Sequence, residues 1–389
     1  MKILILHKWL IMGGVERILI NYLALLQGEP NLDIDILIDF DTEDNAFHNK
    51  IPKKFPISYI FDRNHKKQRD SIYSARKESV LNRIKYKLFN RKEKILRKQK
   101  LTDKIVGNDY DVVINFSQHF DPYIEFDRIS VPIIRWQHLA YEPKNNHYLK
   151  KDISILVRYS KIIVISNAMR EQMISLTNIS SNKFELIFNP LNISHIVEQA
   201  DILPYAGLRK EHFFTQVARL DKIKQHDKLI EIYAELVKYG RTEKLYILGN
   251  GEECNYLKHL IEKLNLKNRC ILLGEVENPY PYIKYATLFL HTSAKEGLPT
   301  VLLESLLLNT PVVAMDCPTG PSEILDNGRC GALVTLNNKD EFVQKTIELL
   351  HNPEMIEKMQ INMKTHLEKF SEQEIRRKFI GVLDKLVGK

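Results

Sequence analysis

Two glutamates stand eight positions apart in the stretch from Lys295 to Glu304, which reads K-E-G-L-P-T-V-L-L-E. The apolar residues 288–290 run into this stretch like the end of a buried strand, and Pro299 suits the first turn of a helix because its missing N–H is no loss there. We therefore expect Glu296 on a loop at the carboxyl end of a strand and Glu304 on the second turn of the next helix. The free N–H groups of that helix's first turn form an anion site. Two acids beside an anion site predict a ligand with both hydroxyl and phosphate groups, such as a nucleotide sugar.

A pair of cations follows an earlier predicted strand. Residues 213–217 read as a strand, and Arg219 and Lys224 flank the loop between it and the next helix. Two cations on such a loop are well placed to hold a diphosphate, and exposed surface charges are the alternative. A later strand ends in Gly249-Asn250-Gly251-Glu252-Glu253, which alone is weak evidence for a ligand-binding loop.

The first half of the chain begins with a predicted strand at 2–6, a loop that ends in Gly13-Gly14 and a helix at 15–26. Strand, glycine turn and helix are the usual start of a doubly wound α/β domain. The dinucleotide fingerprint G-x-G-x-x-G is absent. His119 and His138 follow two further strands, at the ends where open α/β sheets bind ligands. At least one of them is a candidate ligand contact, and strand-end histidines without a function are the alternative.

The sequence Asp39-Phe40-Asp41 closes a predicted strand at 33–39. A D-x-D motif at a strand end can hold a divalent metal against a diphosphate, and a solvated acidic loop is the alternative. Glu43 and Asp44 continue the polarity, so we favour the loop and expect no metal site.

Length and composition indicate a two-domain globular protein. The chain has 389 residues, of which 44% are hydrophobic and 27% charged, and this length exceeds one ordinary core. Its four cysteines show no C-x-x-C spacing, which favours reduced thiols in a cytosolic protein. The first apolar run ends at His7 and Lys8, so we expect no signal peptide. No segment approaches the roughly 20 apolar residues that a spanning helix needs.

The net charge of +8 is concentrated in residues 65–100, where fourteen Lys and Arg residues meet three acidic ones. Apolar residues at helical spacing predict an amphipathic basic helix. They are Val80, Leu81, Ile84, Leu88, Ile95 and Leu96. We favour a helix that lies on an anionic membrane surface. A solvated insertion stays open, and a nucleic-acid partner is not expected because no binding motif accompanies the charge.

The alternation of strands and helices restarts after an irregular stretch near residues 190–204. We therefore predict an α/β protein with an N-terminal Rossmann-like domain at 1–195, which carries the basic insertion, and a C-terminal Rossmann-like domain at 205–370. We expect the two doubly wound domains to face each other across a cleft. A final amphipathic helix within 371–389 could pack on either half, and packing back on the N-terminal domain is one of these two possibilities.

In this ordered set of motifs the chain resembles the retaining glycosyltransferases of family 4, which have the GT-B fold. The resemblance rests on Glu296-x7-Glu304 in its setting, on Arg219 and Lys224, on Gly249-x-Gly251-x-Glu253 and on Gly13-Gly14-Val15-Glu16. It spans most of the chain, although only the first motif is specific alone. The run C-P-T-G-P-S-E-I-L at residues 317–325 is similar to one in transferases that build bacterial lipopolysaccharide or capsule polysaccharide.

The resemblance implies a role for each matching residue. Glu304 would bind the ribose hydroxyls, Glu296 would contact the donor sugar, and Arg219 and Lys224 would neutralise the diphosphate. The family's histidine would be His119 or His138. The other residues expected to bind the donor are Gly13, Gly14, Gly249, Gly251, Glu253, Val276, Gly297, Leu298 and Thr300. Two departures from the family pattern are Gln225, where glycine often follows the second cation, and the displacement of His119 by a few residues.

The function implied is transfer of a hexose, with retention, from a nucleotide-diphosphate sugar to a glycan or lipid-linked acceptor. UDP is favoured as the nucleotide, and the N-terminal domain would bind the acceptor. The enzyme would need no metal and no cofactor, and it would work in the cytoplasm, peripherally on the cytoplasmic face of the inner membrane. A non-hydrolysing nucleotide-sugar epimerase and a non-catalytic basic membrane-binding protein stay open as alternatives.

Overall fold

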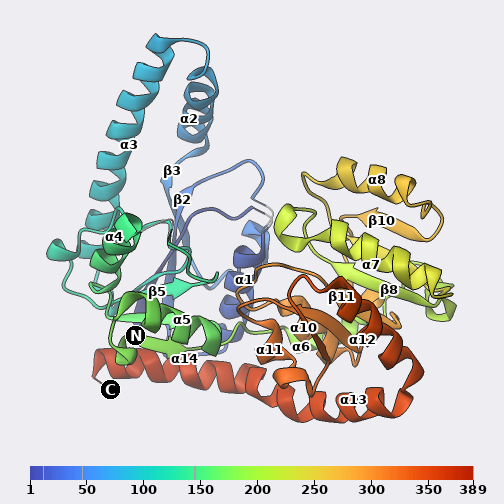
Figure 1. Cartoon of the computed structure of the whole chain (residues 1–389). Helices are drawn as coiled ribbons and strands as arrows, with labels where there is room; N and C mark the ends of the chain where they lie inside the picture. The colour runs from blue at the N-terminus through green and yellow to red at the C-terminus, as the bar shows by residue number, and fades with distance from the viewer. Residues whose placement is uncertain (12, 46, 144–145, 389) are drawn as a thin grey trace. The chain divides into compact units, whose positions relative to one another are not determined.

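The computed structural model describes residues 1–11, 13–45, 47–143 and 146–388, and the chain forms two compact units (Figure 1). Unit 1 consists of Met1–Ile165, Arg170–Pro190 and Ile375–Lys389. Unit 2 consists of Ser166–Met169 and Leu191–Glu374. The end of the chain therefore belongs to unit 1, although it follows all of unit 2 in sequence.

Unit 1 is built on a seven-stranded sheet in which all neighbouring strands run parallel. The strand order is β3-β2-β1-β4-β5-β6-β7, so the winding direction reverses between β1 and β4. The strands are β1 (Lys2–His7), β2 (Asp33–Phe40), β3 (Ile57–Phe61), β4 (Val112–Asn115), β5 (Ile133–Gln137), β6 (Lys161–Val164) and β7 (Phe184–Leu186). The largely apolar strands β1, β4 and β6 fit a parallel sheet that is buried on both faces.

The helices of unit 1 connect these strands, and the last one returns from the end of the chain. They are α1 (Gly14–Leu26), α2 (Arg63–Ala75), α3 (Val80–Val106), α4 (Asn146–Leu156), α5 (Asn167–Thr177), which begins in unit 2, and α14 (Glu372–Val387). The ring of Phe379 on α14 lies 5.8 Å from Tyr22 on α1 and 6.0 Å from Trp136 on β5, measured between centroids. These contacts fix α14 on unit 1.

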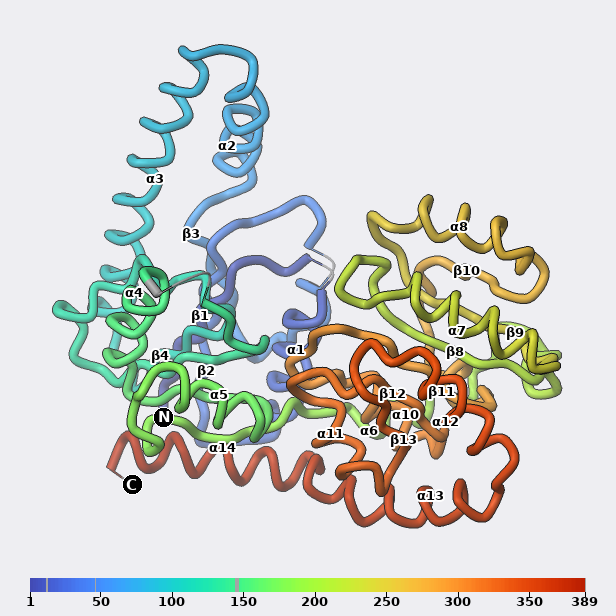
Figure 2. Tube along the Cα trace, viewed as in Figure 1, coloured from blue at the N-terminus to red at the C-terminus, as the bar shows by residue number. Residues whose placement is uncertain are grey.

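The basic segment forms a helical hairpin that projects beyond the sheet. Figure 2 follows the chain outward along α2 and back along α3. The prediction of one amphipathic helix is wrong here, because the chain turns after α2 and Ser79 caps α3 by accepting a hydrogen bond from the Asn82 N–H. The apolar residues singled out in the sequence all lie on α3 and are exposed.

Unit 2 has a six-stranded sheet, again with all neighbouring strands parallel. The order is β10-β9-β8-β11-β12-β13, so the winding reverses between β8 and β11. The strands are β8 (Phe213–Val217), β9 (Lys244–Leu248), β10 (Cys270–Gly274), β11 (Leu288–His291), β12 (Val312–Asp316) and β13 (Ala332–Thr335). The predicted doubly wound α/β architecture is thus confirmed in both units.

The helices of unit 2 lie between and after these strands. They are α6 (Ile193–Ala200), α7 (His226–Lys238), α8 (Cys254–Lys263), α9 (Tyr280–Lys284), α10 (Thr300–Leu307), α11 (Pro321–Ile324), α12 (Lys339–His351) and α13 (Pro353–Leu367). Among the helices of both units, as far as the chain is described, none combines the length and the apolar character needed to cross a membrane.

Candidate functional site

The strand order of unit 2 brings the two charged loops of the sequence together. In an open parallel sheet, ligands bind beyond the carboxyl ends of the strands where the winding reverses. The loop after β8, residues 218–225, and the loop after β11, residues 292–299, leave the sheet at this point. The backbone N–H of Ala294 donates to Ile223 O at 2.8 Å, and Thr292 Oγ1 donates to Lys224 O at 3.1 Å, so the loops are bound directly to each other.

Glu296 lies at the centre of this contact and is 7% exposed. Lys224 Nζ donates to Glu296 Oε1 at 2.6 Å, and His291 Nε2 lies 3.3 Å from the same oxygen. Burial by itself would raise the pKa of Glu296, but His291 and Lys224 outweigh it and lower the pKa to about 2. The carboxylate is therefore ionised at neutral pH, where it can accept hydrogen bonds but cannot donate a proton.

The loop after β12, which contains Thr319 and Gly320, contacts the backbone around Glu296. Thr319 Oγ1 donates to the backbone carbonyl of Glu296. Gly320 has φ +98°, and a Cβ there would overlap Pro299 Cδ and lie 3.0 Å from Gly297 O. Only glycine permits this backbone approach, because both the positive φ and the missing side chain are needed. The run at residues 317–325 is therefore part of the construction of the site.

The loop after β8 contains a strained position directly after the second cation. Gln225 has φ +51° and ψ +45°, the left-handed region that glycine adopts without cost. This backbone conformation explains why the family often has glycine at this position. The departure noted in the sequence thus changes the residue type but keeps the turn.

Arg219 lies beside the glycine loop that follows β9. A Cβ at Gly249, where φ is +137°, would overlap Ala218 O, and one at Gly251 would overlap Leu220 O. The backbone N–H of Glu253 donates to Leu220 O at 2.9 Å. The glycines therefore let this loop pack against the loop that carries Arg219, whose side chain is 79% exposed and lies 3.0 Å from Asp221 Oδ2.

The remaining predicted residues of unit 2 lie on α10 or in the core. Thr300 begins α10, and Glu304 follows one turn later with 7% exposure. Leu298 is buried just before the helix. Val276 is partly buried and packs against a cluster of core residues. The predicted positions on loop and helix are those observed, whereas their roles toward a donor stay predictions.

In unit 1, the glycine turn before α1 is closed by an acidic side chain. A Cβ at Gly13 would overlap Glu16 Oε2, and Glu16 Oε1 lies 3.2 Å from His7 Nε2. Gly14 has open space around it. Within unit 1, a larger residue at position 13 would displace the folded-back Glu16 carboxylate, which places a negative charge at the start of α1.

The two predicted histidines of unit 1 differ in their surroundings. His138 is buried, its Nε2 donates to Phe116 O at 2.7 Å, and burial lowers its pKa to about 3, so the ring is neutral. His119 remains partly exposed, and its Nε2 lies 2.6 Å from Asp39 Oδ2. The His119 side chain therefore reaches solvent and is oriented by the buried Asp39 carboxylate. His138, by contrast, is part of the core.

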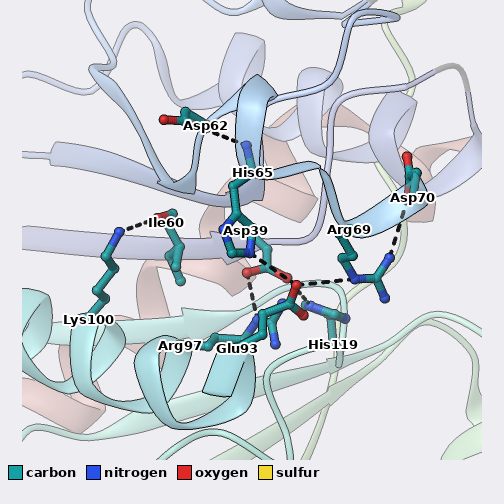
Figure 3. Close-up of polar contacts among 10 residues, drawn as sticks. All are labelled: Asp39, Ile60, Asp62, His65, Arg69, Asp70, Glu93, Arg97, Lys100 and His119. Atoms are coloured by element: carbon teal, nitrogen blue, oxygen red, sulfur yellow. Dashed lines mark hydrogen bonds and ion pairs between the residues drawn. The ribbon is translucent and has the colours of Figure 1, made fainter. Parts of the chain in front are cut away.

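Asp39 belongs to a buried network of charges that Figure 3 shows in full. Arg97 Nε donates to Asp39 Oδ1 at 2.8 Å, and Arg97 Nη2 donates to Glu93 Oε1 at 2.9 Å. His65 and Arg69 reach Glu93 from α2, at 3.2 and 3.3 Å. Both oxygens of Asp39 are thus engaged by protein groups and the residue is fully buried. Neither a metal ligand nor a solvated loop describes it, so both interpretations of the D-x-D sequence are wrong for Asp39.

Sequence reasoning missed two residues that matter to these clusters. His291 ends β11 and lies against Glu296, and its position at a strand end five residues before the glutamate is the signal in the sequence that marks it. Arg97 reaches Asp39 from 58 residues away, and nothing local in the sequence marks it among the other cations of the hairpin.

The family match lies in the C-terminal half of the chain. A sequence model of the family "Glycosyl transferases group 1" matches residues 205–366. An uncharacterized glycosyltransferase of Methanocaldococcus jannaschii is 36% identical over 174 residues, which cover 43% of each chain. The N-acetylgalactosamine-N,N'-diacetylbacillosaminyl-diphospho-undecaprenol 4-alpha-N-acetylgalactosaminyltransferase of Campylobacter jejuni is 32% identical over 243 residues, 61% of this chain and 65% of the relative.

A third relative is the lipopolysaccharide 1,6-galactosyltransferase of Salmonella typhimurium, 26% identical over 215 residues, 54% of this chain and 56% of the relative. The chain thus spans between 43% and 65% of the length of these three relatives. None of these comparisons supports the epimerase or the non-catalytic alternative.

A solved structure extends the likeness to the whole fold. Anabaena HepE in complex with UDP-glucose is 18% identical, and the match covers 99% of both chains with a TM-score of 0.77. At this identity the match establishes the fold, which is the predicted GT-B fold of two Rossmann-like domains. Together with the family match, it confirms the resemblance seen in the sequence: the chain has the GT-B fold, and its residues 205–366 match the sequence model of the glycosyl transferases group 1 family.

Proposed function

We propose that the protein is a retaining glycosyltransferase that moves a hexose from a nucleotide-diphosphate sugar, with UDP as the favoured nucleotide. The acceptor is a glycan or a lipid-linked saccharide in the synthesis of lipopolysaccharide or another surface polysaccharide. The observation that carries the proposal is the Lys224–Glu296 pair at the point where the winding of the unit 2 sheet reverses. The names of the Campylobacter and Salmonella relatives support the sugar and acceptor classes, and the UDP-glucose complex of Anabaena HepE supports the nucleotide.

The charges of this site suit the departure of a nucleoside diphosphate. Departure leaves negative charge on the diphosphate, and Lys224, Arg219 and the free N–H groups at the start of α10 would stabilise it. Because these groups supply the positive charge, we propose that no metal is required. Full activity after treatment with EDTA supports this, and loss of activity that Mg²⁺ or Mn²⁺ restores contradicts it.

The acids of the site would hold the sugar and the ribose. Ionised Glu296 can accept hydrogen bonds from donor-sugar hydroxyls, and Glu304, one turn into α10, is the candidate for the ribose hydroxyls. The anomeric carbon then becomes oxocarbenium-like, and the acceptor hydroxyl attacks the face that the diphosphate leaves. This gives retention without a covalent enzyme nucleophile.

For unit 1 we propose acceptor binding, with His119 rather than His138 as the family's histidine. His119 is partly exposed and oriented by Asp39, whereas the His138 ring is buried and held by a backbone carbonyl. Replacement of His119 by alanine should therefore lower the transfer rate more than the same change at an exposed histidine such as His147.

The helical hairpin supports a peripheral location on the cytoplasmic face of the inner membrane. On α3, Val80, Leu81, Leu88 and Ile95 are between 58% and 78% exposed among many cations. Such a surface suits an anionic bilayer, where each Lys or Arg contributes about 1 kcal/mol near the surface. Co-sedimentation with vesicles of anionic lipid tests this, with Leu81→Glu and Leu88→Glu as disrupting variants and neutral vesicles as the control.

The activity is tested with a panel of nucleotide-diphosphate sugars. We expect thermal stabilisation by UDP and by at least one UDP-sugar, and release of UDP when a saccharide acceptor is added. Product with the anomeric configuration of the donor supports retention. Absence of binding and turnover with every nucleotide sugar would contradict the proposal.

A further inference from the structure

A cavity of about 270 Å³ lies in unit 1 at the base of the helical hairpin. Its wall comes from three segments: the loop after β1, with Trp9 and Ile11, the loop after β2, residues 41–44, and one face of α2. All three follow the carboxyl ends of strands β1, β2 and β3, the side of an open parallel sheet where ligands bind.

The buried network sets the face of α2 that lines this cavity. Arg63, Lys66, Lys67 and Asp70 stand at positions i, i+3, i+4 and i+7, so they share one face of the helix. His65 and Arg69 share another face, which turns to Glu93 on α3 (Figure 3). Because Glu93 is also bound to the buried Arg97, the rotation of α2 is fixed from inside the unit.

The charged groups of the cavity are arranged as ion pairs. Arg63 Nε lies 3.0 Å from Asp41 Oδ2, Lys67 Nζ lies 2.6 Å from Glu43 Oε1, and Lys66 pairs with Asp70. Four acidic side chains and three basic ones line the wall. This near balance disfavours a site for a free anion. Neighbouring donors and acceptors instead match the hydroxyl groups of a neutral sugar, each of which donates and accepts one hydrogen bond.

Trp9 adds an apolar surface to this polar wall. The Nζ of Lys8 lies 3.6 Å from the centroid of the Trp9 ring, so one face of the indole is covered by the chain itself. The Trp9 side chain also lines the cavity. The C–H groups of a pyranose ring carry a partial positive charge and pack against the negative face of an aromatic ring.

We propose that this cavity is a subsite for one neutral hexopyranose ring of the acceptor glycan, with Trp9 as the stacking platform and the Arg63–Asp41 pair as the hydroxyl-binding group. The volume is near the lower end of the roughly 300–1,000 Å³ of small-molecule pockets, which suits one sugar ring and not a nucleotide. The inference rests on the proposed transferase function and names its acceptor site in unit 1.

Saturation-transfer NMR with simple sugars tests the subsite without knowledge of the natural acceptor. The probes are methyl α-D-glucopyranoside, methyl β-D-galactopyranoside and N-acetylgalactosamine, with inorganic phosphate as a competitor. We expect transfer to at least one sugar with the full-length protein and with Trp9→Phe. We expect its loss, or at least tenfold weaker binding, with Trp9→Ala and with Arg63→Gln. Tyr239→Ala, an exposed aromatic residue of unit 2, is the control and should bind like the parent protein.

Thermal stabilisation by UDP, recorded for each variant, separates this inference from the proposed function. If UDP stabilises all variants and sugar binding is absent from the parent protein or unchanged in both Trp9→Ala and Arg63→Gln, the subsite is wrong while the transferase function stands. Displacement of the sugars by phosphate at equal concentration would show an anion site instead and overturn the inference. If UDP and its sugars bind to no variant, the proposed function itself fails.

Discussion

Both units contain a buried carboxylate that lies between a cation and a histidine at the carboxyl end of the sheet. In unit 2, Glu296 lies between Lys224 and His291. In unit 1, Asp39 lies between Arg97 and His119. The two clusters have the same chemical parts and differ in burial and in the origin of the cation.

The origin of the cation separates a binding site from an anchor. Lys224 comes from a loop at the winding reversal. Its side chain is 20% exposed, so a ligand can reach it. The Arg97 side chain is only 2% exposed. It comes from the hairpin, so its ion pair with Asp39 holds α3 to the end of β2. The cation of the Glu296 cluster is therefore accessible to a donor, as the proposed function requires, whereas the cation of the Asp39 cluster is not.

The largest effect is expected when the anchor is broken. Arg97→Met leaves Asp39 and Glu93 buried without their cation, and breaking a buried pair costs about 3–5 kcal/mol. Urea denaturation should show this loss of unfolding free energy. The control is Arg83→Met on the exposed part of α3, which should change stability little. Equal stability of both variants would show that the network does not anchor the hairpin.

Removal of the corresponding cation in unit 2, Lys224, should lower activity more than stability. Lys224→Gln removes a cation from the diphosphate site, and loss of one such group typically lowers kcat by about 10²–10³-fold. Its stability loss should be smaller than that of Arg97→Met, because water reaches the Lys224 side chain. Lys222→Gln, an exposed cation on the same turn, is the matched control. Transfer by Lys224→Gln at the parent rate would remove Lys224 from the site.

The loss of unfolding free energy at acidic pH should reflect protonation of Glu296. Its folded-state pKa of about 2 lies below the ordinary 4.5. The stability it contributes is therefore fully present above pH 4.5 and is lost as the pH falls toward 2. Urea titrations between pH 5 and pH 3 should show a shallower decline for Glu296→Gln than for the parent protein. Parallel declines would show that the carboxylate is not held by Lys224 and His291.

The smallest effect is expected at the loop behind Glu296. Gly320→Ala should cost about 1–2 kcal/mol from the positive φ and more from the overlap with Pro299. Gly240→Ala is the control, because Gly240 has φ +83° with nothing near its Cβ position. A decline in transfer rate for Gly320→Ala alone would show that this contact positions Glu296. Equal behaviour of both variants would limit Gly320 to a local turn.

The sequence predicted the parts of the fold and site that depend on local patterns. Most strands, the setting of Glu296 and Glu304, and the loop of Arg219 and Lys224 follow from hydrophobic runs, turn residues and motifs within a few positions. The edge strands β3 and β13 were not predicted. The Arg97–Asp39 pair depends on packing between distant segments, and nothing local distinguishes Arg97 from the thirteen other Lys and Arg residues of 65–100. The apolar spacing gives no sign of the break between α2 and α3, because all residues of that pattern lie on α3.

The central claim is that Lys224 and Glu296 belong to a donor site, and binding of UDP by isothermal titration tests it most directly. The account predicts that the parent protein and Lys222→Gln bind UDP alike, and that Lys224→Gln binds it at least tenfold more weakly while remaining folded. Equal affinity of Lys224→Gln and the parent protein, or no UDP binding by any of the three, would contradict the account.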